Sequence, residues 1–173
     1  MISLILSDSH GRTDRIEEAV RRAGKVDQIL FLGDLTRDIE GMSFDAPVIS
    51  VRGNCDGFSL FGDSGIPEER RISVGEYTVL MMHGHTASVK HTTLNAIAKA
   101  QAADADVLLF GHTHIPICEY LPEGYELYGA RLKKPLYIFN PGSIGRPAEG
   151  RPSFGIMTVR RGGGILLSHG YLA

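Results

Sequence analysis

The sequence predicts an α/β fold in which two sheets pack together, with helices on their outer faces. Short apolar runs alternate with helical patterns in the first half of the chain, whereas the second half contains short β-like segments separated by proline and glycine. The 173 residues are 43% hydrophobic and 22% charged, which is typical of a globular protein with a sizeable core. We therefore expect a single domain over residues 1–173.

The first half contains the elements that alternate between strand and helix. A branched apolar run at 2–6 predicts a buried strand. The following helix is predicted because Ile16, Ala19 and Ala23 recur at helical spacing and Gly24 then ends the pattern. Further apolar runs predict strands at 28–32, 48–51, 77–82 and 107–110. We also expect a hairpin that joins 70–74 to 77–82, and a helix over 90–103.

The second half predicts antiparallel strands at 115–120, 136–140, 154–160 and 165–171. The glycine-rich segment 57–68 is expected to be a loop. Its apolar residues Phe58, Leu60 and Phe61 indicate either a partner surface, which leaves room for a homo-oligomer, or a mobile lip beside a site.

Composition argues against several classes of protein. The formal net charge of −2 argues against broad nucleic-acid binding. No apolar run approaches the ~18 residues that a membrane-spanning helix needs, so no membrane association is expected. Cys55 and Cys118 form no disulfide framework, and the first residues lack the features of a signal peptide. We expect a cytoplasmic protein.

Polar residues follow five of the predicted strands, each next to a glycine: Asp8 and His10, Asp34, Asn54, His83 and His85, and His112 and His114. Ligands of open α/β sheets bind at the carboxyl ends of the strands, so these side chains are expected to converge. Carboxylate, amide and imidazole groups are ligands for divalent metals. Two residues that lie two apart, such as Asp8 and His10, can point the same way at the end of a strand.

Each cluster alone also has an ordinary structural interpretation. Asp8 resembles a helix cap, Gly33-Asp34 and Gly53-Asn54 resemble turns, and His83 and His85 resemble surface histidines. Five independent strand ends that all carry metal-ligand residues favour a metal site over coincidence.

In this order, the motifs Asp8-Ser9-His10, Gly33-Asp34, Gly53-Asn54, His83 and Gly111-His112-Thr113-His114 resemble the calcineurin-like metallophosphoesterase family, and most closely its small prokaryotic phosphodiesterase branch. The resemblance covers about residues 1–115. It implies a four-layer αββα sandwich of two mixed sheets. Many family members carry histidine directly after the asparagine, whereas this chain has Cys55, so the resemblance does not identify the general acid. Asn140-Pro141-Gly142-Ser143 resembles a family turn near the site, and we expect it to be structural.

The resemblance also implies the metal ligands. Asp8, His10 and His114 would hold one divalent ion, Asn54, His83 and His112 a second, and Asp34 would bridge both. Mn²⁺ is favoured, with Fe²⁺, Ni²⁺ or Zn²⁺ as alternatives. A metal-bridging hydroxide would attack phosphorus between the two ions. Asp34, Asn54 and His85 are the expected catalytic residues, His85 either contacting a phosphate oxygen or orienting a ligand.

The predicted function is hydrolysis of small phosphodiesters. A phosphomonoesterase or a nuclease of the same fold is an alternative within the enzymes. The main rival outside them is a non-catalytic protein-binding scaffold, because the retromer subunit that has this fold looks like a phosphoesterase but serves as a binding platform.

Overall fold

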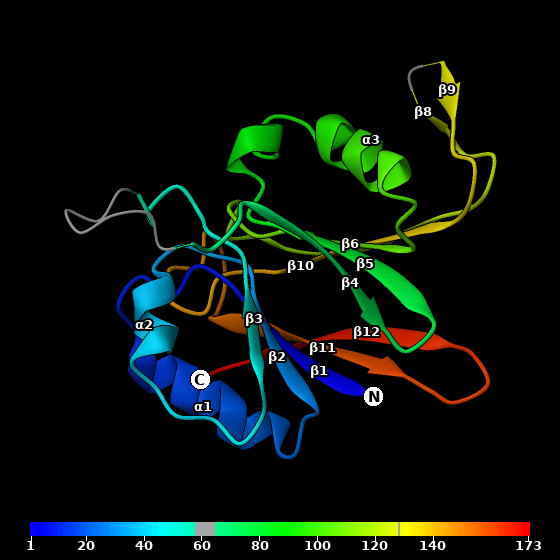
Figure 1. Ribbon diagram of the computed structural model, residues 1–173. Coiled ribbons are helices and arrows are strands. Elements are labelled where there is room, and N and C mark those ends of the chain that lie inside the picture. Colours follow the sequence, from blue (N-terminus) through cyan, green and yellow to red (C-terminus); the bar gives the residue numbers. More distant parts are fainter. Residues whose placement is uncertain (58–64, 128) are drawn as a thin grey trace.

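The computed structural model describes residues 1–57, 65–127 and 129–173. Within them the chain forms two five-stranded sheets, a small hairpin and helices on the outer faces of both sheets (Figure 1). The predicted α/β class, two mixed sheets flanked by helices, is confirmed. Phe58, Leu60 and Phe61 of the expected loop lie outside the described residues.

The first sheet has the order β12-β11-β1-β2-β3. Its strands are β1 (Ile2–Leu6), β2 (Gln28–Phe31), β3 (Val48–Ser50), β11 (Ser153–Val159) and β12 (Ile165–Tyr171). The three N-terminal strands are parallel, and β11 runs antiparallel to β1. Helices α1 (Thr13–Ala23) and α2 (Thr36–Glu40) cover its outer face (Figure 1).

The second sheet has the order β4-β5-β6-β10-β7. Its strands are β4 (Glu69–Val74), β5 (Tyr77–Met82), β6 (Val107–Leu109), β7 (Pro116–Leu121) and β10 (Leu136–Pro141). The outer face carries the 3₁₀ turn η1 (His85–Ala87) and α3 (Leu94–Ala102), and the hairpin β8 (Glu126–Leu127) and β9 (Ala130–Arg131) lies between β7 and β10 in the chain.

Strand β10 corrects the expectation of an all-antiparallel second half. It pairs in parallel with β6 on one side and antiparallel with β7 on the other. The helix expected over 90–103 is shorter, because α3 begins only at Leu94, whose backbone N–H contacts Thr92 Oγ1 at 3.3 Å. Neither α2 nor η1 was predicted, since each is too short to show a helical period.

Buried side chains on alternate strand positions fill the spaces on the two faces of each sheet. Ile5 and Met81 lie in the core between the sheets, whereas their neighbours Leu4 and Met82 pack beneath the helices. Strands buried on both faces appear in the sequence as continuous apolar runs, as at 2–6 and 77–82. The parallel strands thus become rigid supports, and their carboxyl ends meet at one edge of the molecule.

Candidate metal centre

The site residues expected from the sequence lie just beyond the carboxyl ends of parallel strands. Asp8 and His10 follow β1, Asp34 follows β2, and Asn54 follows β3. From the second sheet, His83 follows β5, and His112 and His114 follow β6. Because the sheets pack face to face, the two sets of strand ends approach each other.

The backbone is strained at these positions. Asp8, His10 and Asp34 have φ angles of 56°, 46° and 64°, and those of His112 and His114 are 65° and 60°. A non-glycine residue in this left-handed region costs about 1–2 kcal/mol. Strained conformations of this kind gather at functional sites, where the surrounding structure holds them.

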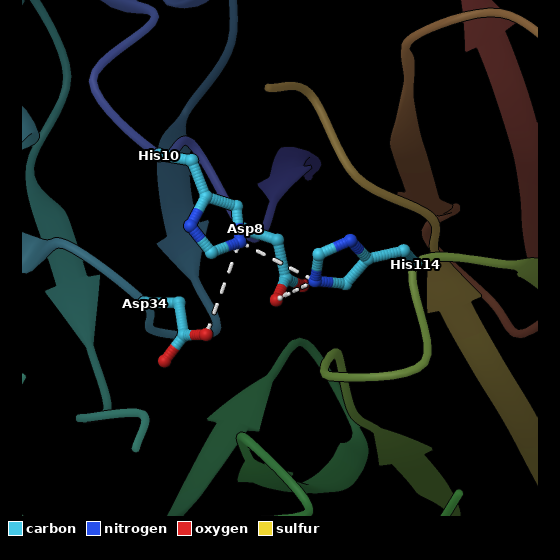
Figure 2. Close-up of side chains that lie close together, drawn as sticks. All are labelled: Asp8, His10, Asp34 and His114. Atoms are coloured by element: carbon cyan, nitrogen blue, oxygen red, sulfur yellow. Dashed lines mark hydrogen bonds and ion pairs between the residues drawn. The ribbon is translucent and has the colours of Figure 1, made fainter. Parts of the chain in front are cut away.

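One group of side chains joins Asp8, His10, Asp34 and His114 (Figure 2). One ligand atom from each lies within 4.8 Å of all the others. His114 Nε2 is 3.0 Å from Asp8 Oδ1 and 3.3 Å from His10 Nε2, and His10 Nε2 is 4.0 Å from Asp34 Oδ2. Figure 2 shows all four side chains pointing toward a common centre.

A second group joins Asp34, His83 and His112, so Asp34 belongs to both groups. His83 Nε2 lies 3.1 Å from His112 Nδ1 and 3.4 Å from Asp34 Oδ1. Asn54 Oδ1 is 3.2 Å from the same His83 nitrogen. The structure therefore places Asn54 beside the second group, as an amide oxygen among two imidazoles and a carboxylate.

The orientation of the histidine rings fits a bound cation. His83 Nδ1 is 2.8 Å from the Leu32 carbonyl oxygen, and His114 Nδ1 is 2.5 Å from that of Arg146. A neutral imidazole that donates through Nδ1 presents its Nε2 lone pair, and both Nε2 atoms point into the site. Asp8 Oδ1 is buried and makes no hydrogen bond within the described residues unless His114 Nε2, 3.0 Å away, carries a proton. The lone pairs of these nitrogens and of Asp8 Oδ1 therefore face one another, and a bound cation would remove their mutual repulsion.

The other oxygen of Asp8 is held by the chain. Its Oδ2 accepts hydrogen bonds from Ser7 Oγ and from the backbone N–H of His112, the latter at 3.1 Å. Ser143 Oγ donates to the Asp8 carbonyl oxygen at 2.8 Å. Only Oδ1 is left to face the site, so the carboxylate is oriented before any ligand arrives.

The electrostatics also favour positive charge at the centre. The hydrogen bond to Asp8 raises the pKa of His114 above its ordinary value. Burial alone would lower the pKa of His83, but the hydrogen bond to Asp34 and the charges of Asp8 and Asp34 raise it. Burial, together with the charge of His83, lowers the pKa of His112 to about 4. The carboxylates of Asp8 and Asp34 thus favour positive charge at this place, as a bound cation would supply.

Two glycines allow the turns after β2 and β3 to approach closely. Gly33 has φ +92°, and a Cβ atom there would lie 2.5 Å from the backbone nitrogen of Gly53. A Cβ atom on Gly53 would collide with the backbone nitrogen and the carboxylate of Asp34. The close approach of these two turns brings Asp34 next to Asn54.

His85 lies beside the second group rather than within it. Its ring centroid is 5.5 Å from that of His83 and 6.2 Å from that of His112. Burial, with the charge of His83, lowers the pKa of His85, so the ring is neutral near pH 7. It lines a pocket together with Arg52, Gly53, Asn54, Asp56, Gly57 and Glu68. The pocket adjoins the second ligand group through Asn54.

Cys55, which stands where many family members have histidine, is exposed. Its backbone N–H donates to Asp34 Oδ1 at 2.8 Å. Burial and the Asp34 carboxylate raise the pKa of its thiol to about 11, so it stays protonated at neutral pH. Cys55 therefore supports Asp34 through its backbone.

Several groups that orient the ligands have no signal in the sequence. The carbonyl groups of Leu32 and Arg146 act through the backbone, which every residue possesses. The turn at 140–143 does have a signal, and its expected structural role agrees with its contacts. Buried Asn140 donates to the Gly111 carbonyl oxygen at 2.8 Å, directly before His112.

Comparisons with known proteins agree with this geometry. The family model for the calcineurin-like phosphoesterase superfamily domain matches residues 1–162. Probable metallophosphoesterase YsnB of Bacillus subtilis is 34% identical over 158 residues, which cover 90% of this chain and 83% of that protein. Vacuolar protein sorting-associated protein 29 of Schizosaccharomyces pombe is 27% identical over 190 residues, covering 99% of this chain and 90% of its own.

The structure of a novel archaeal phosphodiesterase is similar with a TM-score of 0.69 at 21% identity, over 98% of this chain and 99% of that one. At this identity the likeness is one of fold. Among the described residues, no helix has the length and apolar character needed to cross a membrane.

Proposed function

This chain belongs to the calcineurin-like phosphoesterase superfamily, and we propose that it is a phosphodiesterase that depends on two divalent metal ions. The proposal rests on Asp34, whose carboxylate belongs to both groups of ligand atoms. A carboxylate with two oxygens can hold two cations side by side. The buried carboxylate oxygen Asp8 Oδ1, which faces His114 Nε2 at 3.0 Å, supports cation binding at this place.

The proposed ligands divide between the two groups. Asp8, His10 and His114 would hold one ion, and Asp34 would contribute one oxygen to it. A second ion would be held by Asn54, His83 and His112 together with the other oxygen of Asp34. Oxygen and nitrogen donors without thiolate suit Mn²⁺, which we propose, and also Fe²⁺, Ni²⁺ and Zn²⁺.

Two such ions, when bound, would supply Lewis-acid charge and an activated water for attack on phosphorus. The chain itself holds the ligands in place and makes the site attractive to anions. Only Asp8 and Asp34 carry formal negative charge among the proposed ligands, so two divalent ions leave the centre positive although the chain carries −2. Distant charges are screened over about 8–10 Å, so the local charge decides phosphate binding.

His85 is the proposed substrate contact. Its ring is neutral, so one of its nitrogens carries a hydrogen that can be donated to a phosphate oxygen. Its place beside His83 and at the wall of the pocket supports this role. Asn54, which lines the same pocket, would bind an ion and would also lie within reach of the substrate.

Phosphodiester substrates are part of this proposal, and the archaeal phosphodiesterase of nearly equal length shares the fold that would bind them. A phosphomonoesterase or a nuclease would use the same centre. A non-catalytic scaffold is the second candidate, and the similarity to vacuolar protein sorting-associated protein 29 over 99% of the chain favours it. The strained backbone at the ligand positions favours the enzyme, because such conformations gather at functional sites.

The test measures hydrolysis of bis(p-nitrophenyl) phosphate and p-nitrophenyl phosphate after chelation and reloading with Mn²⁺, Fe²⁺, Ni²⁺ or Zn²⁺. We expect the diester to be turned over faster, with Mn²⁺ the most effective. Faster turnover of the monoester identifies a phosphomonoesterase, and cleavage of an oligonucleotide in preference to both identifies a nuclease. A protein that binds none of these ions and hydrolyses none of these esters is a scaffold.

We also propose a cytoplasmic location, since Cys55 and Cys118 are both free thiols. A homo-oligomer, the other expectation about partners, is tested by measuring the mass of the protein in solution.

A further inference from the structure

Two carboxylates outside both ligand groups are bound to the turns that carry the ligands. Asp38 lies on α2, and its Oδ2 accepts hydrogen bonds from Ser9 Oγ and from the backbone N–H of Gly11, both at 2.7 Å. Ser9 and Gly11 are the two neighbours of His10. Asp38 therefore holds the chain on both sides of one proposed ligand.

Asp56 binds two turns at once. Its Oδ2 accepts from the backbone N–H of Asp34 at 2.9 Å and from that of Gly53 at 2.6 Å. Its Oδ1 accepts from the N–H of Thr36 at 2.6 Å and from Thr36 Oγ1 at 3.1 Å. Asp56 thus joins the turn after β2, which carries Asp34, to the turn after β3, which carries Asn54.

Both carboxylates act where the backbone is strained. His10 has φ 46°, and Asp34 and Leu35 have φ angles of 64° and 71°. Such conformations persist only where surrounding contacts hold them. The bonds from Asp38 flank His10, and those from Asp56 flank the Asp34–Leu35 pair. A charged acceptor also makes stronger hydrogen bonds than a neutral one.

We propose that Asp38 and Asp56 are positioning residues that set the affinities of the two metal ions separately. Asp38 acts more strongly on the ion of the His10 group, because its two bonds flank His10, although its partner Ser9 Oγ also lies 3.2 Å from the Asp34 carbonyl oxygen. Asp56 acts on both ions, because it positions the shared Asp34 as well as Asn54. This inference rests on the proposed two-ion function. Partners that orient metal ligands typically contribute about 10- to 100-fold to metal affinity.

Asp38 and Asp56 differ in how many of their carboxylate oxygens accept hydrogen bonds, so an asparagine should affect the two positions differently. Asp38 uses one oxygen for both bonds, so an asparagine at 38 can place its amide oxygen there and keep both donors. Asp56 uses both oxygens, so an asparagine at 56 turns an –NH₂ group toward backbone N–H groups on one side. Asp38→Asn should therefore be mild and Asp56→Asn severe, whereas alanine should be severe at both positions.

The experiment titrates Mn²⁺ into metal-free wild type and the four variants by calorimetry, and records the electron paramagnetic resonance spectrum of each loaded protein. Asp14→Ala is the matched control, because Asp14 is an exposed carboxylate that bonds to the Arg12 side chain at 2.7 Å and not to the backbone N–H groups that flank a ligand. Thermal melts of the metal-free proteins check folding. If the alanine variants do not fold, the asparagine pair, which preserves side-chain volume, carries the test.

Wild type and Asp14→Ala should bind two Mn²⁺ ions and show the spectrum of a spin-coupled pair. Asp38→Ala should lose about 10- to 100-fold affinity at one site and show isolated Mn²⁺ when partly loaded, and Asp38→Asn should stay near wild type. Asp56→Ala and Asp56→Asn should weaken both sites.

Wild type that binds no pair of ions overturns the proposed function itself. If wild type binds the pair but Asp38→Ala and Asp56→Ala match it, the positioning role is wrong. Equal effects of asparagine at the two positions, or equal weakening of both sites by Asp38→Ala, would refute the separate control of the two ions.

Discussion

Replacing Asp34 by alanine should remove both metal ions at once, because this carboxylate is shared by the two ligand groups. Replacing Asn54 by alanine should remove only one ion, since its amide oxygen lies beside His83 in the second group. The two variants therefore differ in how much stability metal ions can add.

The magnitude follows from the number of sites. A ligand at one hundred times its dissociation constant stabilises the folded state by about 2.7 kcal/mol per site. Two sites give roughly 5 kcal/mol, which for a protein of this size raises Tm by roughly 10–20 °C. Asn54→Ala should keep about half of that rise, and Asp34→Ala should lose nearly all of it.

The assay compares the melting temperature of each protein in chelator with that in Mn²⁺, alongside the number of ions bound. The comparison is made within each variant, because losing Asp34 also leaves the Cys55 backbone N–H without its acceptor, at a cost of about 1–3 kcal/mol. An Asp34→Ala protein that binds two ions and shows the full rise in Tm would refute the bridging role.

Three further changes test other parts of the site. His85→Ala should lower diester turnover about 100-fold with both ions still bound; loss of an ion in the titration would make His85 a ligand instead. Asn140→Ala removes the hydrogen bonds to the Gly111 carbonyl, Thr113 Oγ1 and the Gly142 N–H. It should therefore reduce the free energy of unfolding by about 3 kcal/mol and lower Tm by roughly 6–12 °C. An unchanged melting temperature would contradict a structural role for Asn140. Gly53→Ala places a methyl group against Asp34 and should weaken Mn²⁺ binding about 10- to 100-fold in calorimetry, whereas wild-type affinity would show that the turn can move aside.

The chemical character of the site could be predicted from the sequence because it depends on residue type and strand position. Asp8, Asp34 and His112 each follow a continuous apolar run, and such runs mark strands buried on both faces. Carboxyl ends of parallel strands meet at one edge, so the donor types and their approximate meeting place follow from local patterns. The ligand roles themselves stay predictions until ions are measured.

Strand pairing was harder to predict, because it depends on partners far away in the chain. The segment that forms β10 has the same apolar pattern whether it pairs in parallel or antiparallel, and only the insertion of β10 between β6 and β7 decides its direction. Short elements such as α2 lack a full helical period, so their sequences contain no signal of their own.

What the sequence by itself determined is the set of side chains that can bind metal and the strands that carry them, since both follow from residue type and from periodicity along the chain. Only the tertiary structure decided which lone pairs face inward and which groups hold them there. The Leu32 carbonyl orients His83, and the carboxylates of Asp38 and Asp56 accept hydrogen bonds from distant backbone N–H groups. These hydrogen bonds join segments about 20–50 residues apart in the chain. Backbone donors and acceptors are the same at every residue, so their pairing becomes visible only once the chain has folded.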